Sequence, residues 1–357
     1  MKNISYIICS NGYGHTKRAT KVLNELIGRD LGYKINVICN KSNISYLKSN
    51  ITSEFQAIHI NTSLMDSEPN WLNYIDLNFS NYKKWSSNFA KSKTILNSDL
   101  IVSDNYVTTL GKKKTILIGS FLWLDILNDI NEESRKISEF EQKLLEKYNP
   151  EMISVNKMYN NSIDKLTRVN SVPWFESRKV FEKPFFFNSI LITAGGTNEL
   201  DILFIKLIER ISLDNYRKNI YLDSKLYKKI KLNKKPLSPN VKEFDFTEIS
   251  FKKIDAVICR PGIGIITDCI SYLIPIISIY GNKNSEIKFN AKKVASLKMG
   301  ISLEFKKDFI DNRNYSIINE HINSKSKLDF FTNQIKNEKM GGHILAADII
   351  IDTINNE

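Results

Sequence analysis

Residues 255–272, DAVICRPGIGIITDCISY, decide the fold of this chain. Asp255–Arg260 has an apolar, partly β-branched centre, which is typical of a strand covered on both faces. Pro261 and Gly262 predict a turn, and the apolar run Gly264–Tyr272 predicts a helix. The stretch therefore predicts a strand, a tight turn and a helix in succession, which is the repeating unit of an α/β fold.

The same alternation of short apolar runs and helical segments extends over the whole chain. Strands are predicted at Ser5–Ser10, Lys34–Asn40, Gln56–Ile60, Leu100–Asp104, Thr115–Ser120, Met152–Asn156, Ser189–Ala194, Lys218–Leu222, Val241–Phe246, Asp255–Arg260, Pro275–Tyr280 and Ile301–Phe305. Helices are predicted at Thr16–Leu31, within Trp71–Leu96, and at Glu133–Tyr148, Glu199–Ile211, Gly264–Tyr272, Ser285–Lys298, Lys327–Asn337 and His343–Ile354. We therefore predict an α/β protein of two Rossmann-like, doubly wound domains that face each other across a ligand-binding cleft.

A break in this alternation predicts the domain boundaries. Asn170–Pro184 contains two prolines and several aromatic residues without periodicity. We predict an N-terminal domain over residues 1–170, a linker over 171–184 and a C-terminal domain over 185–342. Residues 343–357 are predicted to form a last helix that packs back on the N-terminal domain.

The composition narrows the classes of protein and partner. A chain of 357 residues, 42% of them hydrophobic, can bury a core, which excludes a fully disordered protein. The formal net charge of +12 suggests an anionic partner. The excess is +5 over residues 1–170 (22 basic and 17 acidic side chains) and +7 over the rest (29 and 22). Because the excess is dispersed and no nucleic-acid-binding module is visible, we expect no nucleic-acid partner.

The cysteines and the apolar runs point to a cytoplasmic protein. Cys9, Cys39, Cys259 and Cys269 lie in apolar segments without Cys-x-x-Cys spacing, so we expect free thiols, no zinc site and no metal. The N-terminal apolar run of about five residues is too short for the core of a signal peptide. No run approaches the ~20 residues of a membrane-spanning helix. Peripheral contact with the inner face of the membrane is the alternative location.

A glycine motif, Asn11-Gly12-Tyr13-Gly14-His15, lies between the first predicted strand and the first predicted helix. Its glycines allow a tight turn and a close approach of the backbone to a ligand. The helix start favours the neutral, base form of an imidazole. We predict that Gly12, Tyr13 and Gly14 form an acceptor loop and that His15 is the general base for an acceptor hydroxyl. The alternative is a histidine that caps its own loop.

Asp104 is the second candidate for proton transfer. It lies in Ser103-Asp104-Asn105 at the end of a predicted strand, and therefore at the same edge of the sheet as His15. As a carboxylate it can deprotonate the acceptor hydroxyl in place of His15. A helix cap is the commoner role for an aspartate in this position.

A second loop, Thr193-Ala194-Gly195-Gly196-Thr197-Asn198, follows the first strand of the second half and opens a helix at Glu199. Gly195, Gly196 and Thr197 are candidates to hold a diphosphate through backbone N–H groups and a hydroxyl. The alternative is an ordinary strand-to-helix turn with Asn198 as the N-cap.

The stretch with which we began carries a third site. Gly262 and Gly264 open its helix, and Asp268 follows the turn by about one helical turn, where a carboxylate suits the two hydroxyls of a ribose. Arg260 is a candidate phosphate ligand, with a plain salt bridge as the alternative. Farther along, Glu286 near a helix start is a candidate for sugar hydroxyls, with a helix-dipole role as the alternative.

Together these motifs resemble the GT-B glycosyltransferases, most closely the peptidoglycan N-acetylglucosaminyltransferase group. The matching positions are Arg260, Gly262, Asp268, Glu286, Asn290 and Ala291, with Gly12, Gly14 and His15 on the first glycine loop and Gly195 and Gly196 on the second. The sequence departs from the group at Asn11 and Tyr13, at Asp268 in place of Glu, and at Glu286-Ile287 in place of paired Gln. An N-acetylglucosamine donor is therefore not implied.

The resemblance implies an inverting, metal-independent transfer from a nucleotide diphosphate sugar, with a uridine diphosphate sugar expected, to a hydroxyl of a bacterial cell-surface glycan or glycolipid. It implies no cofactor, acceptor binding by residues 1–170 and donor binding by residues 185–342. It places Asn290 beside Glu286 in the donor site and Phe246 against the nucleotide base. As an apolar strand residue, Phe246 has plain core packing as its alternative.

Three other functions stay open. A nucleotide-sugar hydrolase of the same fold would use water in place of the acceptor. A non-catalytic sugar-binding subunit and, more remotely, a basic nucleic-acid-binding protein are the others. The aromatic residues of 71–89, with Phe121-Leu122-Trp123-Leu124, are candidates for a lipid-linked acceptor or a membrane face, and core packing of a helix is their alternative.

Overall fold

The computed structural model describes residues 1–10, 12–51, 58–70, 77–128, 130–155, 158, 161–181, 188–196, 198, 200–232, 238–281, 284–305 and 312–356. By their internal contacts these residues form two compact units, which are described separately. The first comprises Met1–Glu176 and Met340–Glu357, and the second comprises Ser177–Lys339.

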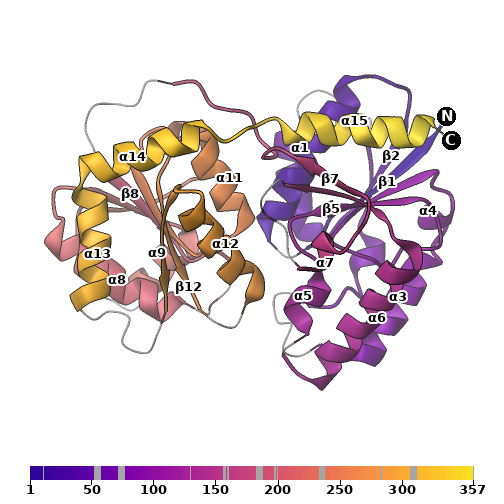
Figure 1. The fold of residues 1–357 in the computed structure, drawn as a ribbon, viewed down its shortest axis with the longest axis horizontal. Coiled ribbons are helices and arrows are strands. Elements are labelled where there is room, and N and C mark those ends of the chain that lie inside the picture. Colours follow the sequence, from indigo (N-terminus) through magenta and orange to yellow (C-terminus); the bar gives the residue numbers. More distant parts are fainter. Residues whose placement is uncertain are drawn as a thin grey trace. The chain divides into compact units, whose positions relative to one another are not determined.

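The first unit is a doubly wound α/β domain (Figure 1). Among the described residues its parallel sheet has seven strands in the order β3-β2-β1-β4-β5-β6-β7. The strands are β1 (Asn3–Ile7), β2 (Lys34–Ile38), β3 (Ile58–Asn61), β4 (Leu100–Asp104), β5 (Thr115–Gly119), β6 (Glu151–Val155) and β7 (Val169–Val172). The helices are α1 (Tyr13–Gly28), α2 (Ile44–Asn50), α3 (Phe79–Ala90), α4 (Lys93–Leu96), α5 (Trp123–Leu127), α6 (Glu132–Tyr148), α7 (Asn161–Asp164) and α15 (Gly342–Asn355). The strand order reverses between β1 and β4, so their carboxyl ends flank the usual ligand position of such sheets.

The second unit repeats this architecture. Its parallel sheet has six strands in the described segments, in the order β10-β9-β8-β11-β12-β13. They are β8 (Ser189–Thr193), β9 (Asn219–Leu222), β10 (Val241–Glu243), β11 (Ala256–Cys259), β12 (Ile276–Tyr280) and β13 (Gly300–Glu304). Its helices are α8 (Asp201–Asp214), α9 (Ser224–Leu232), α10 (Glu248–Phe251), α11 (Ile263–Ser271), α12 (Ser285–Ser296), α13 (Asn312–Asn323) and α14 (Lys325–Lys336). Here the order reverses between β8 and β11, which again marks the ligand-binding edge.

The predicted α/β class with two doubly wound sheets is confirmed, and the segment between the halves differs from the expectation. The range 171–184, predicted as a linker, begins inside β7, and the two units part between Glu176 and Ser177. β7 escapes a search for apolar runs because its residues are mostly partly exposed. The last helix, α15, belongs to the first unit and packs along α1, where Arg29 forms an ion pair with Asp348.

A buried acid links two helices of the first unit. Glu141 on α6 is fully buried, and its Oε1 accepts a hydrogen bond from the Tyr82 hydroxyl on α3 at 2.7 Å. Burial raises the pKa of Glu141 to about 8, and the nearby Asp125 carboxyl adds to the rise. The Tyr82 hydroxyl opposes this rise without cancelling it. Glu141 is therefore protonated at neutral pH.

Stability should fall with rising pH because of Glu141. The folded protein keeps this proton up to a pH of about 8, whereas the unfolded chain releases it near 4.5. The free energy of unfolding should lose up to about 1.4 kcal/mol per pH unit across that window. Glu141→Gln should remove this slope, and Glu139→Gln, an exposed change on the same helix, should keep it. Urea unfolding at several pH values from 4.5 to 9 measures the difference; equal slopes would refute the assignment.

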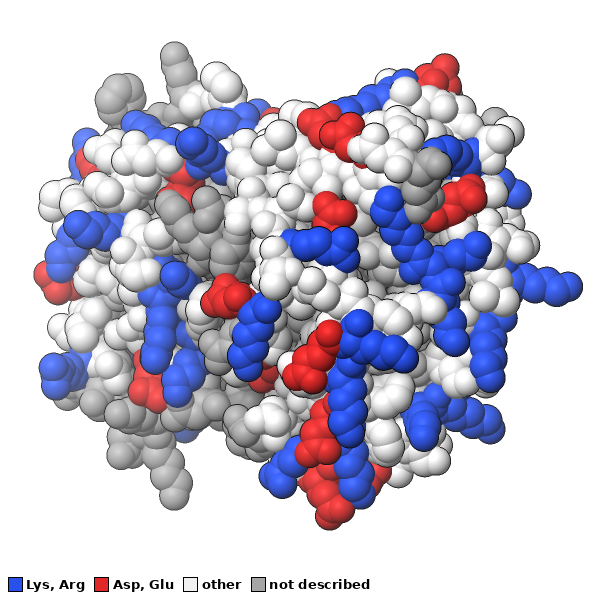
Figure 2. Space-filling view, turned by 45° about the vertical axis from the view of Figure 1, so that its right-hand side comes forward, with Lys and Arg blue, Asp and Glu red and all other residues white. Residues whose placement is uncertain are grey.

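The distribution of surface charge and the hydropathy of the helices bear on an anionic partner and on a membrane. On the face shown in Figure 2, acidic side chains lie among the described basic ones over much of the surface, and several basic side chains lie close together toward the right-hand edge. In the described part of the chain, no helix combines the length and the hydropathy that crossing a membrane requires.

Candidate functional site

His15 is held in the first turn of α1, at the carboxyl edge of the first sheet. Gly12 precedes the helix at a φ of 89°, a left-handed backbone that glycine adopts without strain, and its N–H donates to Ser10 O at 2.7 Å. This turn brings the chain from β1 into α1 within a few residues. His15 is only 5% exposed, whereas Tyr13 on the same turn is 65% exposed and lies 6.2 Å from the Tyr46 ring.

His15 and Asp104 meet at this edge. Because β4 pairs in parallel with β1, Asp104 at the end of β4 lies beside the start of α1. His15 Nδ1 is 2.8 Å from Asp104 Oδ1, and the Asp104 side chain is fully buried. A carboxylate at Nδ1 fixes the proton on that nitrogen, which leaves Nε2 as the basic atom of the neutral ring. The two residues predicted for proton transfer are thus in contact.

Arg18, which the sequence reasoning missed, completes the group. It lies one helical turn after His15, and its Nη2 is 2.6 Å from Asp104 Oδ1 and 3.2 Å from His15 Nδ1. It is buried, with its guanidinium 6.0 Å from the centre of the Phe175 ring. The guanidinium thus places a positive charge directly against the buried carboxyl group. The i, i+3 spacing from His15 was the available signal for this residue.

The side chains of Phe121 and Tyr6 lie near His15 and Asp104. The Phe121 ring meets the His15 ring edge-on, with 5.8 Å between centroids. Tyr6 on β1 is fully buried, and burial together with the Asp104 charge raises its pKa far above the usual range. Tyr6 therefore stays protonated and neutral. We conclude that His15, Asp104 and Arg18 form a buried group in which Arg18 faces the Asp104 carboxyl and Nε2 is the imidazole nitrogen that the carboxyl leaves free.

In the second unit, the glycine loop after β8 is open. Gly195 has a φ of 70°, and neither Gly195 nor Gly196 has an atom within 4 Å of where a Cβ would lie, so the backbone is accessible. The helix begins at Asp201 rather than Glu199, and Asn198 is not its N-cap; its side chain accepts a hydrogen bond from Lys229 at 3.1 Å. Thr197 lies outside the described residues.

The turn from β11 into α11 forms a second open backbone site. Gly262 is the N-cap, without a side-chain capping bond and with open space where a Cβ would lie. Gly264 follows in the first turn, and Asp268 is buried one turn farther along. Arg260 is half-buried at the end of β11, where its N–H donates to Thr193 O at 3.1 Å. The two glycine turns thus adjoin, because β8 and β11 are neighbouring strands.

Glu286 and Asn290 lie against the same turn. Asn284 caps α12 by accepting from Ile287 N at 3.0 Å, which places Glu286 in the first turn of the helix. Asn290 Nδ2 lies 3.1 Å from both Glu286 Oε1 and Pro261 O. Asn290 therefore fixes the Glu286 carboxylate beside the turn that carries Gly262.

Phe246 is neither the strand residue nor the core residue that the sequence suggested. It is not in a strand, since β10 ends at Glu243, and it is not core, since it is 44% exposed. Its φ of 56° is a strained left-handed conformation for a bulky residue. Its ring rests edge-on against Phe244, with 4.9 Å between centroids, and against Phe251 at 6.0 Å. The result is an exposed aromatic ring supported by buried ones.

Most of the described residues considered for a membrane face are core instead. Tyr82, Trp85 and Phe89 are almost fully buried, and so is the run Phe121–Leu124. Trp71, Leu72 and Tyr74 lie outside the described residues. These buried rings cannot form a lipid-contacting surface. Within the described ranges, no cluster of three or more His, Cys, Asp or Glu residues could hold a metal ion.

The chain was compared with known proteins. No protein-family model matches the sequence, and no curated protein sequence is significantly similar. Three solved structures are similar over almost the whole chain. The glycotransferase of kitacinnamycin has a TM-score of 0.64 at 14% identity and covers 99% of both chains. The spinosyn rhamnosyltransferase SpnG, complexed with thymidine diphosphate, has a TM-score of 0.64 at 10% identity over 99% of this chain and 100% of that one. Arabidopsis thaliana UGT89C1, complexed with quercetin, has a TM-score of 0.67 at 10% identity over 99% of both. The chain therefore has the two-domain GT-B fold of glycosyltransferases, as the sequence resemblance implied.

Proposed function

We propose that the chain is an inverting, metal-independent glycosyltransferase that moves a sugar from a nucleotide diphosphate to a hydroxyl of a glycan or glycolipid. The observation that carries this proposal is the buried group of His15, Asp104 and Arg18 at the switch point of the first sheet. It supplies a base with a fixed tautomer on a glycosyltransferase fold.

The chemistry follows from that base. His15 Nε2 removes the proton of the acceptor hydroxyl as its oxygen attacks the anomeric carbon. The bond from that carbon to the diphosphate oxygen breaks, and the nucleotide diphosphate leaves with the electron pair. The proton stays on Nε2, and Asp104 stabilises the imidazolium through Nδ1–H. Attack opposite the leaving group inverts the anomeric configuration.

The second unit is proposed to bind the donor. The glycine turns at Gly195 and Gly262 offer backbone N–H groups to the diphosphate, and the α11 N-terminus adds a positive dipole end. Asp268 is assigned to the ribose hydroxyls and Glu286 to the transferred sugar. The exposed Phe246 ring is a stacking surface for the base.

Nucleotide binding and product analysis test this function together. Calorimetry should detect binding of uridine diphosphate ahead of thymidine and guanosine diphosphate, and Asp268→Ala should weaken that binding by about tenfold or more. With a uridine diphosphate sugar and an oligosaccharide mixture, NMR should show a new glycoside of inverted configuration, unaffected by EDTA. Free sugar formed at the same rate without acceptor would identify a hydrolase. No binding of any nucleotide would refute the proposal.

A further inference from the structure

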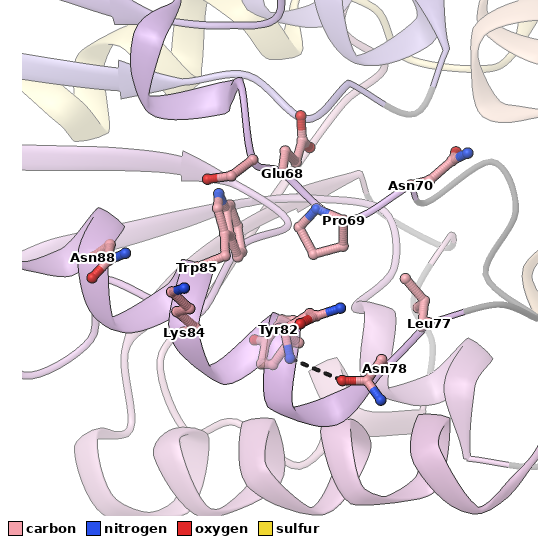
Figure 3. A pocket seen from close by; sticks show the side chains of 11 residues that line it. Glu68, Pro69, Asn70, Leu77, Asn78, Tyr82, Lys84, Trp85 and Asn88 are labelled. Carbon is pink, nitrogen blue, oxygen red and sulfur yellow. Dashed lines mark hydrogen bonds between the residues drawn. The ribbon is translucent and has the colours of Figure 1, made fainter.

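A pocket with both polar and apolar lining lies in the first unit (Figure 3). It has a volume of about 470 Å³, which lies within the usual range for ligand sites. The loop that carries Glu68, Pro69 and Asn70 lines one side, and α3 lines the other. All of its lining residues belong to the first unit.

One face of α3 lines this pocket. Asn81, Lys84, Trp85 and Asn88 line it, at positions i, i+3, i+4 and i+7 of the helix. The amides and the lysine are exposed, whereas Trp85 is buried. The pocket therefore has an aromatic base and an amide rim.

Glu68, in the wall of the pocket, is hydrogen-bonded to the two segments that carry His15 and Asp104. Glu68 Oε1 accepts from Ser10 Oγ at 2.8 Å and from the Tyr106 hydroxyl. Ser10 leads into the turn before His15, and Tyr106 follows Asp104 by two residues. Burial raises the pKa of Tyr106 well above its usual value, so its hydroxyl keeps the proton that it donates. A molecule in the pocket thus lies at the same edge of the sheet as the proposed base.

The lining chemistry selects the class of ligand. Each asparagine amide offers two N–H donors and an acceptor oxygen, which matches hydroxyls that both donate and accept. The lining pairs one carboxylate, that of Glu68, with one ammonium, that of Lys84, and so favours neither an anion nor a cation. Apolar side chains lie beside the amides, as the C–H faces and the hydroxyls of a sugar require; they are Pro69, Leu77 and Trp85. We infer that this pocket binds a neutral saccharide as the acceptor; its role as acceptor rests on the proposed function.

A pair of matched double variants tests the inference. Asn81→Ala with Asn88→Ala removes two amides of the rim, and Ser80→Ala with Ser87→Ala makes the same spacing of changes outside the pocket on the same helix. The probes are the methyl β-glycosides of glucose, galactose and N-acetylglucosamine, observed by saturation-transfer NMR, with quercetin as an apolar probe. Uridine and thymidine diphosphate binding is measured on every protein.

The wild type should bind at least one glycoside saturably, the asparagine variant should bind it about tenfold or more weakly, and the serine variant should bind it normally. Nucleotide affinity should be equal in all three. Binding of quercetin but of no glycoside, or undiminished glycoside binding by the asparagine variant, would overturn the inference while leaving nucleotide binding intact. Loss of nucleotide binding in the wild type would instead refute the proposed function, and the glycoside result would then assign only a sugar-binding pocket.

Discussion

Replacing His15 with alanine should lower kcat for sugar transfer by about 10²–10⁴-fold, the usual contribution of a positioned general base. The acceptor hydroxyl would lose the atom that receives its proton, because no other described histidine contacts Asp104. Donor binding belongs to the second unit in this proposal, so the affinity for the nucleotide diphosphate should stay unchanged. Steady-state kinetics with a nucleotide sugar, alongside calorimetry, separates the two quantities.

His59→Ala is the matched control, because His59 is exposed on β3. It should retain wild-type kcat. If His15→Ala turned over a nucleotide sugar as fast as His59→Ala, His15 would not be the base and its contact with Asp104 would be structural.

Replacing Arg18 with methionine should cost the first unit about 3–5 kcal/mol of folding free energy. Methionine keeps much of the side-chain length but leaves the fully buried Asp104 carboxylate without its cationic partner. The same change should reduce kcat, because the carboxylate that orients His15 would lose the group that holds it. Arg18→Lys keeps a cation and should recover part of both losses.

Arg29→Met serves as the comparison for this variant. Arg29 pairs with Asp348 on a partly exposed surface, where an ion pair contributes about 1 kcal/mol or less. Denaturant unfolding of both variants measures the difference. Equal stabilities, or a methionine variant at position 18 with full kcat, would show that Arg18 only fills space.

Most of the strands, and the position of Asp104 at the same edge of the sheet as His15, could be predicted because both depend on local pattern and simple topology. The bounds of β4 matched the apolar run Leu100–Asp104, and parallel pairing with β1 then placed Asp104 beside the first glycine loop. Arg18 could not be predicted from composition, since an arginine on a helix is usually solvated. Its role depends on which face of α1 packs against β4.

The aromatic residues were the hardest to interpret. Tyr82, Trp85 and Phe89 have the spacing of an apolar helix face, which does not distinguish a core from a lipid surface. Phe246 was misassigned for a different reason, because β10 ends at Glu243 and the backbone at Phe246 is left-handed rather than extended. Tertiary packing decided both cases.

The pairing of Trp174 with Met340, next to the hydrogen bond from Gly341 N to Glu176 O, has a consequence for how the chain is made. The segments that leave and re-enter the first unit are adjacent, so the second unit is an insertion in the first. During synthesis all of Ser177–Lys339 emerges before α15 does. The synthesis of the first unit therefore begins before that of the second and ends after it. The face of α1 that receives α15 stays uncovered until α15 has been made.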